Sequence, residues 1–278
     1  MPQELPSFDL VVATVGRVEE LERFLNSLAE QEFRRIRVLV VDQNEDNRAA
    51  DALARHPDLN VEHLRSPRGL SLARNAALSR IDADFVAFPD DDCVYPADLL
   101  ERVAARFSSE PGLDGLTGRV EDAAGSSSAS WKSDSVVLTS DNLWNRGISA
   151  AMFLRAEVVR RVGPFDESLG VGSGQPWSSA EEIDYLIRAI RLGARIEYDP
   201  SLVVRHDVRF DDALVGYRDG ASVGYLLRKH GYPARSVARM LIRPLGGMVV
   251  SLAHLDRARA SYYTATLRGR VRGYRGAR

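Results

Sequence analysis

Three consecutive carboxylates follow an apolar run in this 278-residue chain: Asp90, Asp91 and Asp92 come directly after the segment 84–89. Adjacent carboxylates repel one another, and each loses solvation energy when it is buried. A hard divalent cation would neutralise them, and Mg²⁺ or Mn²⁺ held by one or two carboxylates usually shares its other positions with phosphate oxygens and water. The alternative is a solvated turn, which explains most arbitrary runs of aspartate. The preceding apolar run favours a site for a metal ion and a phosphate.

A second acidic group opens a helix that the sequence predicts near position 181. Glu181, Glu182 and Asp184 follow a segment rich in Gly and Ser, 170–180. In a cleft, one of these carboxylates could act as a general base at neutral pH. Acidic residues in a first helical turn also complement the helix dipole and cap the helix. The sequence leaves both interpretations open.

A histidine and two arginines extend this set of candidate groups. His206 follows the apolar segment 201–204 and is a candidate third metal ligand, although a lone histidine is more often structural or on the surface. Arg68 and Arg74 flank the start of a predicted helix, where guanidinium and backbone N–H groups could bind a diphosphate. Their alternative role is that of incidental basic residues in a helical turn.

The elements that must position these residues alternate through the first hundred positions. Runs rich in Val, Leu, Ile and Phe predict strands, and apolar residues at helical spacing predict the helices between them. The strands are expected at 8–14, 36–42, 59–64 and 84–89, and the helices at 18–31, 47–56, 69–81 and 95–107. This order predicts an α/β fold with a Rossmann-like, mostly parallel sheet, right-handed crossovers and helices on both faces.

Two aspartates mark the carboxyl ends of these strands. Asp42 ends the second predicted strand, and Asp90 follows the fourth. Because ligands of open α/β sheets bind beyond the carboxyl ends of the strands, both lie where a nucleotide is expected.

The regular alternation ends near Leu113. The polar segment 121–135, which contains Ser126, is the best candidate for a mobile loop because its side chains are small. Further along, 148–163 is typical of a strand that runs into a short helix, 179–193 of an amphipathic helix, and 194–207 of a strand.

Composition is that of an ordinary soluble globular protein, with 45% hydrophobic and 27% charged residues. Disordered and fibrous classes are therefore excluded. The single cysteine, Cys93, cannot form an intramolecular disulfide, and no cysteine cluster indicates structural zinc. The first residues lack the basic start and long apolar run of a secretory signal. We expect a cytoplasmic protein.

Charge is distributed unevenly: residues 205–278 contain 15 Lys or Arg against 5 Asp or Glu, and the preceding residues contain 22 against 34. The basic portion is predicted to be helical from residue 213. We expect Arg243, Pro244 and the following Gly pair to interrupt its apolar stretch, 236–255, before it reaches the ~20 residues of a membrane span.

These basic helices have several candidate roles. They could lie on the inner face of the cell membrane as a peripheral contact, or pack on the main domain or on a second subunit of a homo-oligomer. No sequence motif of a nucleic-acid-binding domain accompanies the arginines, so nucleic acid is not expected as a partner.

The order of all these features resembles that of family 2 glycosyltransferases with the GT-A fold, over about Phe8 to His206. The similar segments are 11–31, with Thr14 and Arg17 at family positions, then 38–44, ending near Asp42, and 68–78, 85–96, 162–172 and 180–188. An Asp-x-Asp pattern alone occurs by chance in many chains. Six segments in the family's order are far more specific.

The resemblance implies an inverting, metal-dependent glycosyltransferase that moves a hexosyl or deoxyhexosyl group from a nucleotide-diphosphate sugar to an acceptor hydroxyl. The acceptor would be a glycan or lipid-linked glycan of cell-surface polysaccharide or glycolipid synthesis. The GT-A domain would span 1–209, with a donor half at about 1–112 and an acceptor half at about 113–209. A basic helical C-terminal extension would occupy 210–278.

Site roles follow from the same resemblance, supplemented by the residue chemistry above. Glu182 would be the catalytic base, with Glu181 and Asp184 as alternates. Asp92, helped by Asp90 or Asp91 and with His206 as a further ligand, would hold Mn²⁺ or Mg²⁺. The expected donor-binding residues are Thr14, Arg17, Asp42, Arg68, Arg74, Asp90 and Asp91.

Two positions depart from the family pattern. The family commonly has Asp where this chain has Glu182, and Asn where it has Gly16. Two rival functions remain: a nucleotidyltransferase, which would favour a Gly-rich, Lys-containing loop after the first strand, and a non-catalytic nucleotide-sugar-binding module. The segment after the first strand contains no such loop, which argues against a nucleotidyltransferase. A non-catalytic module would have no reason to retain mutually repelling acids.

Overall fold

The computed structural model describes residues 6–127, 131–206 and 212–276, which fall into two compact units. The first unit comprises Met1–Phe165 and Tyr185–Val208, and the second comprises Asp166–Asp184 and Arg209–Arg278. The predicted boundary at 209/210 lies outside the described residues. The grouping of Asp166–Asp184 with the C-terminal helices has no counterpart in the predicted domains.

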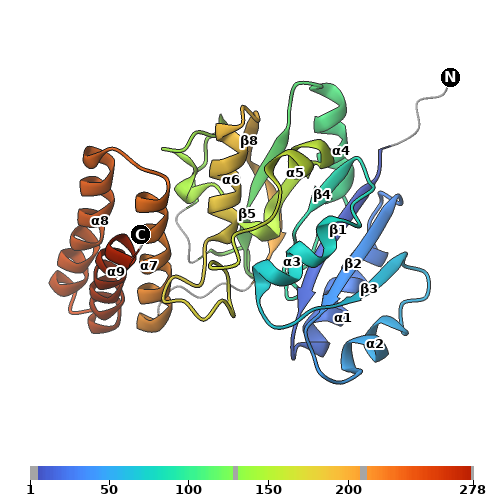
Figure 1. Cartoon of the computed structure of the whole chain (residues 1–278), viewed down its shortest axis with the longest axis horizontal. Coiled ribbons are helices and arrows are strands. Elements are labelled where there is room, and N and C mark those ends of the chain that lie inside the picture. Colours follow the sequence, from blue (N-terminus) through green and yellow to red (C-terminus); the bar gives the residue numbers. More distant parts are fainter. Residues whose placement is uncertain (1–5, 128–130, 207–211, 277–278) are drawn as a thin grey trace. The chain divides into compact units, whose positions relative to one another are not determined.

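The first unit is built on an eight-stranded, mixed sheet (Figure 1). The strands are β1 (Phe8–Thr14), β2 (Ile36–Asp42), β3 (Val61–Arg65), β4 (Phe85–Ala87), β5 (Gly115–Glu121), β6 (Val136–Val137), β7 (Met152–Arg155) and β8 (Ile196–Arg205), in the spatial order β3-β2-β1-β4-β7-β5-β8-β6. The pairs β1–β2, β2–β3, β1–β4 and β5–β8 are parallel, whereas β7 and β6 run antiparallel to their neighbours. The predicted mostly parallel sheet is confirmed, but β5 and β6 were not predicted.

Helices cover both faces of this sheet. They are α1 (Val18–Ala29), α2 (Arg48–Leu53), α3 (Leu70–Leu78), α4 (Leu99–Ser109), α5 (Ala156–Val162) and α6 (Glu181–Arg191), with short 3₁₀ turns at Leu143–Asn145 and Ser149–Ala151. Alternate residues of β1, such as Leu10 and Val12, join one core with Leu21, Phe24 and Phe107 of the helices. Because successive strand residues point to opposite faces, the intervening buried residues face the helices on the other side.

The second unit contains three long helices: α7 (Ala213–Lys229), α8 (Ala234–Ala253) and α9 (Arg257–Gly276) (Figure 1). Glycines at four-residue spacing line the contact between α7 and α9: Gly216, Gly220 and Gly224 on α7, and Gly269 and Gly273 on α9. A Cβ atom at Gly220 would overlap the carbonyl oxygen of Thr266, and one at Gly273 would overlap that of Ala221. The two backbones approach this closely because these positions carry no side chain.

Helix α8 corrects one expectation. It runs unbroken for 20 residues with Pro244 inside it, so the predicted interruption at Arg243 and Pro244 is wrong. An internal proline costs a helix about 3 kcal/mol, but here Pro244 is buried and the nearby Gly247 lies against the ring of Tyr263 on α9. Among the described residues, α8 is the one helix whose length and composition suffice to cross a membrane, with a mean hydropathy of 1.3. Packed helices of soluble proteins also meet this criterion.

Candidate active site

The carboxyl ends of three neighbouring strands form one edge of the first unit. Strand β1 lies between β2 and β4, so the strand order reverses at β1: β2 and β3 follow on one side of it and β4 on the other. In this register Thr14 pairs with Asp42, and Ala13 forms an isolated parallel bridge with Asp90. Asp42 and Asp90 therefore share the edge at which the sequence predicts them.

Asp42 is fully buried and its carboxylate is held from several directions. It accepts hydrogen bonds from the backbone N–H and the side-chain amide of Asn44 at 2.8 and 2.7 Å. Its other oxygen lies 3.0 Å from Nε2 of His63 and 3.2 Å from Nη1 of Arg65, both on β3. The carboxylate is thus fixed in direction at the end of its strand.

Asn44, which bonds to Asp42, also lines a pocket of about 240 Å³, the pocket beside Asp42. It is lined by Gly16, Asn44, Glu45, Asp46, Arg48 and Arg68. Gly16 has φ 73°, in the left-handed region that Gly and Asn both adopt, which accounts for Gly where the family usually has Asn. Its N–H donates to the side chain of Asn44 at 2.7 Å. The loops after β1 and β2 are therefore joined at the pocket wall.

The turn that carries the three aspartates is anchored at both ends. Asp90 bridges to β1, and Val94 exchanges backbone hydrogen bonds with Arg205 at 2.8 and 3.1 Å. Since His206 follows Arg205 directly, this bridge brings the histidine to the turn. Beneath the turn, the fully buried Arg74 reaches Oδ1 of Asp90 with Nη2 at 3.1 Å.

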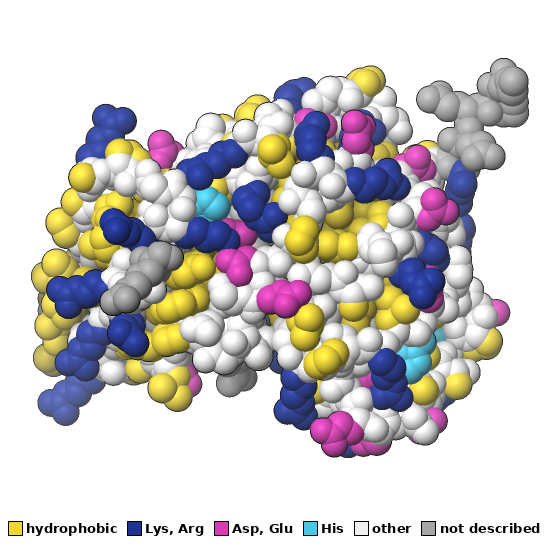
Figure 2. Space-filling view, in the orientation of Figure 1, with side chains coloured by type: hydrophobic (Ala, Val, Ile, Leu, Met, Phe, Trp, Pro, Cys, Tyr) yellow, Lys and Arg dark blue, Asp and Glu magenta, His cyan; other side chains and the backbone are white. Residues whose placement is uncertain are grey.

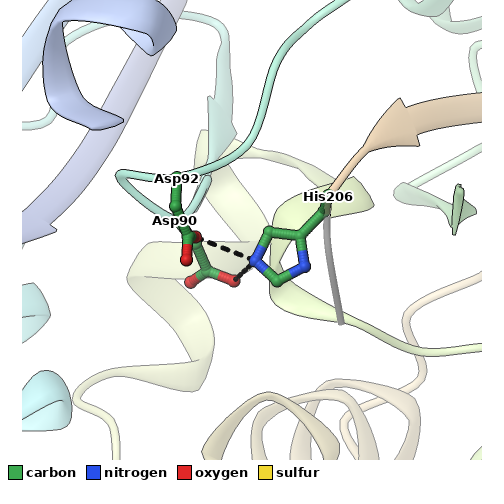
Figure 3. Close-up of side chains that lie close together, drawn as sticks. All are labelled: Asp90, Asp92 and His206. Carbon is green, nitrogen blue, oxygen red and sulfur yellow. Dashed lines mark hydrogen bonds and ion pairs between the residues drawn. The ribbon is translucent and has the colours of Figure 1, made fainter. Parts of the chain in front are cut away.

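Asp90, Asp92 and His206 converge at this edge, as Figure 3 shows. Nε2 of His206 lies 2.9 Å from Oδ1 of Asp92 and 3.7 Å from Oδ2 of Asp90. One ligand atom from each residue falls within 4.8 Å of the others, a spacing that a single cation can bridge. Two carboxylates and an imidazole are suitable ligands for Mn²⁺, and oxygen-rich sets also suit Mg²⁺.

Asp91 is not part of this cluster and pairs with Arg17. Nη1 of Arg17 lies 3.0 Å from Oδ1 of Asp91 and 2.5 Å from Oδ2 of Asp92. Burial raises the pKa of Asp91 to about 6, although hydrogen bonding to Thr14 and the charge of Arg17 oppose the shift. Arg17 therefore contributes positive charge at the carboxylates themselves.

The pKa values of Asp92 and His206 move in opposite directions. Burial alone would raise the pKa of Asp92, but the hydrogen bond and charge of His206 outweigh it and the net shift is downward. Burial alone would lower the pKa of His206, but the hydrogen bond to Asp92 and the charge of Asp90 raise it overall. The pair therefore favours its charged forms.

The predicted diphosphate arginines lie in different surroundings. Arg68 is exposed and lines the pocket beside Asp42. Arg74 is inaccessible to solvent, and its guanidinium lies on Asp90 and over the ring of Phe165, 5.6 Å from the ring centre. A contact of Arg74 with the donor remains a prediction, whereas its support of Asp90 is a feature of the structure.

The three candidate bases belong to the second unit and begin α6. Glu181 and Asp184 are buried, and Glu182 is partly exposed. Oδ1 of Asp184 lies 2.7 Å from Nζ of Lys229 and 2.8 Å from Nε2 of His230, both at the end of α7. These two partners were not among the predicted residues, because nothing in the local sequence links positions so far apart.

The sequence also did not indicate His63 and Arg65, the partners of Asp42. Arg17 was predicted, but its contact with Asp92 was not. All of these contacts depend on which strands are neighbours. Because β2 and β3 pair in parallel with Asp42 opposite Arg65, the register supplies that signal once the strand order is known.

Comparison with known proteins agrees with this architecture. The sequence model described as Glycosyl transferase family 2 matches residues 9–157. The chain belongs to glycosyltransferase family 2. The matched region includes the pocket beside Asp42 and all three aspartates of the turn, whereas His206 and the three candidate bases lie beyond it.

Two curated relatives illustrate the range of this family. The chain is 29% identical over 214 residues to the pre-mycofactocin glycosyltransferase of Mycobacterium tuberculosis, a match that covers 72% of the chain and 42% of that relative. It is 26% identical over 254 residues to the succinoglycan biosynthesis protein ExoM of Rhizobium meliloti, covering 84% and 80%. The chain thus spans less than half of the first relative.

A solved structure shares the fold of the family 2 chain. The mannosyltransferase PcManGT of Pyrobaculum calidifontis, solved with GDP-Man and Mn²⁺, aligns with a TM-score of 0.72 over 98% of this chain and 88% of its own. The two sequences are 16% identical, so the likeness establishes the GT-A fold.

Proposed function

We propose that this family 2 glycosyltransferase transfers a sugar from a nucleotide-diphosphate donor to an acceptor hydroxyl, with inversion at the anomeric carbon and with a divalent metal ion. The convergence of Asp90, Asp92 and His206 at the carboxyl ends of parallel strands carries this proposal. Phosphate-bearing ligands bind at that edge of open α/β sheets.

Asp90, Asp92 and His206 would hold the metal ion, and we favour Mn²⁺ over Mg²⁺ because an imidazole joins the two carboxylates. When bound, the ion would stabilise the negative charge that develops on the leaving nucleotide diphosphate. Arg74 keeps Asp90 in place from below. Arg17, which contacts Asp92, would turn from the carboxylates towards the donor phosphates.

The pocket beside Asp42 would receive the nucleoside. Asp42 does not itself line the pocket, so it would accept a bond from a ribose hydroxyl or a base N–H by exchanging one of its present partners, Asn44 or His63. Arg68 lines the same pocket and carries a positive charge that attracts the diphosphate. Thr14 forms a hydrogen bond with Asp91 at the same edge of the sheet. Closure of the loop near Ser126 over the donor remains a prediction.

Glu182 would remove the proton from the acceptor hydroxyl. Asp184 is a poor candidate because its carboxylate is fully buried and paired with Lys229 and His230, and Glu181 is buried. One base suffices for a single displacement, in which the acceptor oxygen attacks the anomeric carbon as the bond to the diphosphate breaks. That step inverts the configuration.

Donor binding tests the proposal directly. A thermal-shift screen of nucleotide-diphosphate sugars should give a hit that depends on Mn²⁺ and is lost in Asp92→Asn with the fold intact. Equal, metal-independent binding by that variant would remove Asp92 from the site. Donor binding without transfer to any glycan acceptor would instead favour a binding module, and transfer of a nucleotidyl group would favour a nucleotidyltransferase.

We also propose that the acceptor is a glycan or lipid-linked glycan of cell-surface polysaccharide synthesis, used by a cytoplasmic protein that meets the inner face of the membrane. The relative from Rhizobium meliloti is a succinoglycan biosynthesis protein, which supports such an acceptor.

Exposed apolar side chains recur along one face of α8, at Ile242, Leu245, Val249 and Leu252. Figure 2 shows Lys and Arg side chains beside hydrophobic ones over the C-terminal helices. An apolar stripe with flanking arginines is typical of helices that lie on anionic membranes.

Vesicle binding tests this membrane contact. The protein should sediment with anionic vesicles at low salt, less so at high salt, and Val249→Asp should weaken binding. Val137→Asp, which changes an exposed valine of β6, serves as a matched control. Failure of the wild-type protein to sediment at low salt would favour packing or a homo-oligomer.

A further inference from the structure

Helix α7 has two different faces. Its glycine face packs against α9. The side chains of Asp219, Ser222, Tyr225 and Lys229 recur at spacings of three and four residues and therefore form a second, polar face. Every one of these four side chains contacts the segment Asp166–Asp184 of the same unit. That segment ends at the start of α6, which carries Glu182.

Contacts of this polar face reach the chain just before Glu182. The Ser179 hydroxyl donates to Oδ1 of Asp219 at 2.9 Å and lies 2.9 Å from the hydroxyl of Ser222. The backbone N–H of Ser179 donates to the same Ser222 oxygen at 3.2 Å. Nearby, the ring of Trp177 stacks on Tyr225 with an interplanar angle of 10°.

A second set of contacts reaches the chain just after Glu182. Lys229 and His230 both approach Oδ1 of the fully buried Asp184, at 2.7 and 2.8 Å. Because an ionised carboxylate can only accept, Nε2 of His230 is the donor. Lys229 also lies 2.6 Å from Oδ2 of Asp166, so one ammonium group joins both ends of the segment.

Between these two sets lies a strained residue. Ala180 has φ 62°, and among the described residues only Leu255 is another non-glycine residue with positive φ. A left-handed alanine persists only where its surroundings hold it, and such residues cluster at functional sites. Its carbonyl accepts the backbone N–H of Asp184 at 3.1 Å, so this conformation begins the helix of Glu182.

We propose that α7 sets the direction of Glu182 by holding the chain on both sides of it, Ser222 and Asp219 through Ser179, and Lys229 and His230 through Asp184. These are positioning residues, because they act on the backbone that carries the base. The proposal rests on the assignment of Glu182 as the base. It gives the C-terminal helices a part in the transfer step in addition to any contact with a membrane.

The first test separates turnover from donor binding. Ser222→Ala and His230→Ala should each lower kcat about tenfold or more, because small displacements of a catalytic group have large effects, while the KM and Kd for the nucleotide sugar stay unchanged. His230→Gln keeps a donor towards Asp184 and should recover most of the lost kcat. Ser251→Ala, a buried serine bonded within α8, and Arg228→Met, whose guanidinium lies over Tyr274, are matched controls that should retain wild-type kcat.

The second test uses Ala180→Gly. A purely structural role and a positioning role of Ala180 predict different effects of this change on kcat. Glycine adopts positive φ without strain, so the melting temperature should hold or rise. The chain before Glu182 also becomes freer, so kcat should fall. Suppose that Glu182→Gln inactivates the protein but that Ser222→Ala, His230→Ala and Ala180→Gly each keep wild-type kcat. The positioning role would then be overturned, and the proposed base would stand. Full turnover in Glu182→Gln would instead overturn the proposed base.

Discussion

The two units of this family 2 chain are each stabilised in a different way. The first has a sheet whose alternate residues fill apolar cores on both faces, and its site groups stand at strand ends. The second has glycine contacts between α7 and α9 and a set of buried or half-buried polar contacts around Asp184, Ser179 and Asp166. Apolar burial is tolerant of small changes, whereas close backbone contacts and buried charges are not.

This difference matters because the proposed chemistry is divided in the same way. The candidate groups for the metal ion and the nucleotide lie in the first unit, and the candidate base lies in the second. Donor binding and proton removal should therefore respond separately to mutation.

The largest expected effect contrasts Asp92→Asn with Glu182→Gln. We expect Asp92→Asn to lose metal-dependent donor binding, because a neutral amide is a weak ligand for a hard cation. Glu182→Gln should bind donor normally and lose kcat by about 10²–10⁴, the usual contribution of a general base. Donor titration and a transfer assay on the same preparations measure the two effects.

One result would contradict this division of roles. If Glu182→Gln lost donor affinity as fully as Asp92→Asn did, the two groups would act on the same step. Circular dichroism spectra of both variants provide the control for folding.

A glycine substitution tests how the second unit is held. Gly220→Val places side-chain atoms against the carbonyl of Thr266, so we expect α7 and α9 to separate and stability to fall by about 3 kcal/mol or more. Gly246→Ala, in α8, has open space around its Cβ and should be neutral or stabilising by about 0.5–1 kcal/mol. Urea unfolding measures both. Hydrogen exchange should show the loss in Gly220→Val confined to α7, α8 and α9, and uniform loss across β1 and β2 would contradict separate stabilisation.

Much of the first unit could be predicted because its signals are local. Apolar runs place β1, β2 and β4, and helical spacing places Leu21, Phe24 and Leu25 on the buried side of α1. Strand β5 was missed because Gly115 and Gly118 weaken its pattern. The structure requires Gly118, since a Cβ there would overlap the carbonyl of Leu202.

The candidate site was predictable as far as residue types and strand ends go. The aspartates 90–92 and His206 could be proposed as one group because they follow strands. The partners of these groups could not, since the approach of Arg17 to Asp92 and of Lys229 to Asp184 depends on tertiary contacts between distant positions. No periodicity in the sequence encodes such pairs.

The smallest expected effect concerns the pH dependence of the Asp166–Lys229 contact. Burial alone would raise the pKa of Asp166, but hydrogen bonds from Lys229 and Ser168 outweigh it and the net shift is downward. A lowered carboxyl pKa stabilises the fold above the ordinary value near 3.8, and the contribution is lost as pH falls through the lower, folded-state pKa. Burial alone would lower the pKa of Lys229, but Asp166 and Asp184 raise it overall, so its contribution is lost only as pH rises through a value above 10.5.

Asp166→Asn should therefore cost about 1 kcal/mol at neutral pH, and the difference from wild type should shrink below about pH 3.8. The exposed pair of Asp46 and Arg48 in the first unit provides the matched comparison, as Asp46→Asn. Salt should abolish the effect at Asp46, where both side chains are about half exposed, and preserve most of it at Asp166, which is only 23% exposed. Urea unfolding at two salt concentrations measures this. Equal sensitivity to salt would mean that the polar contacts of the second unit are no more protected than those on the surface of the first.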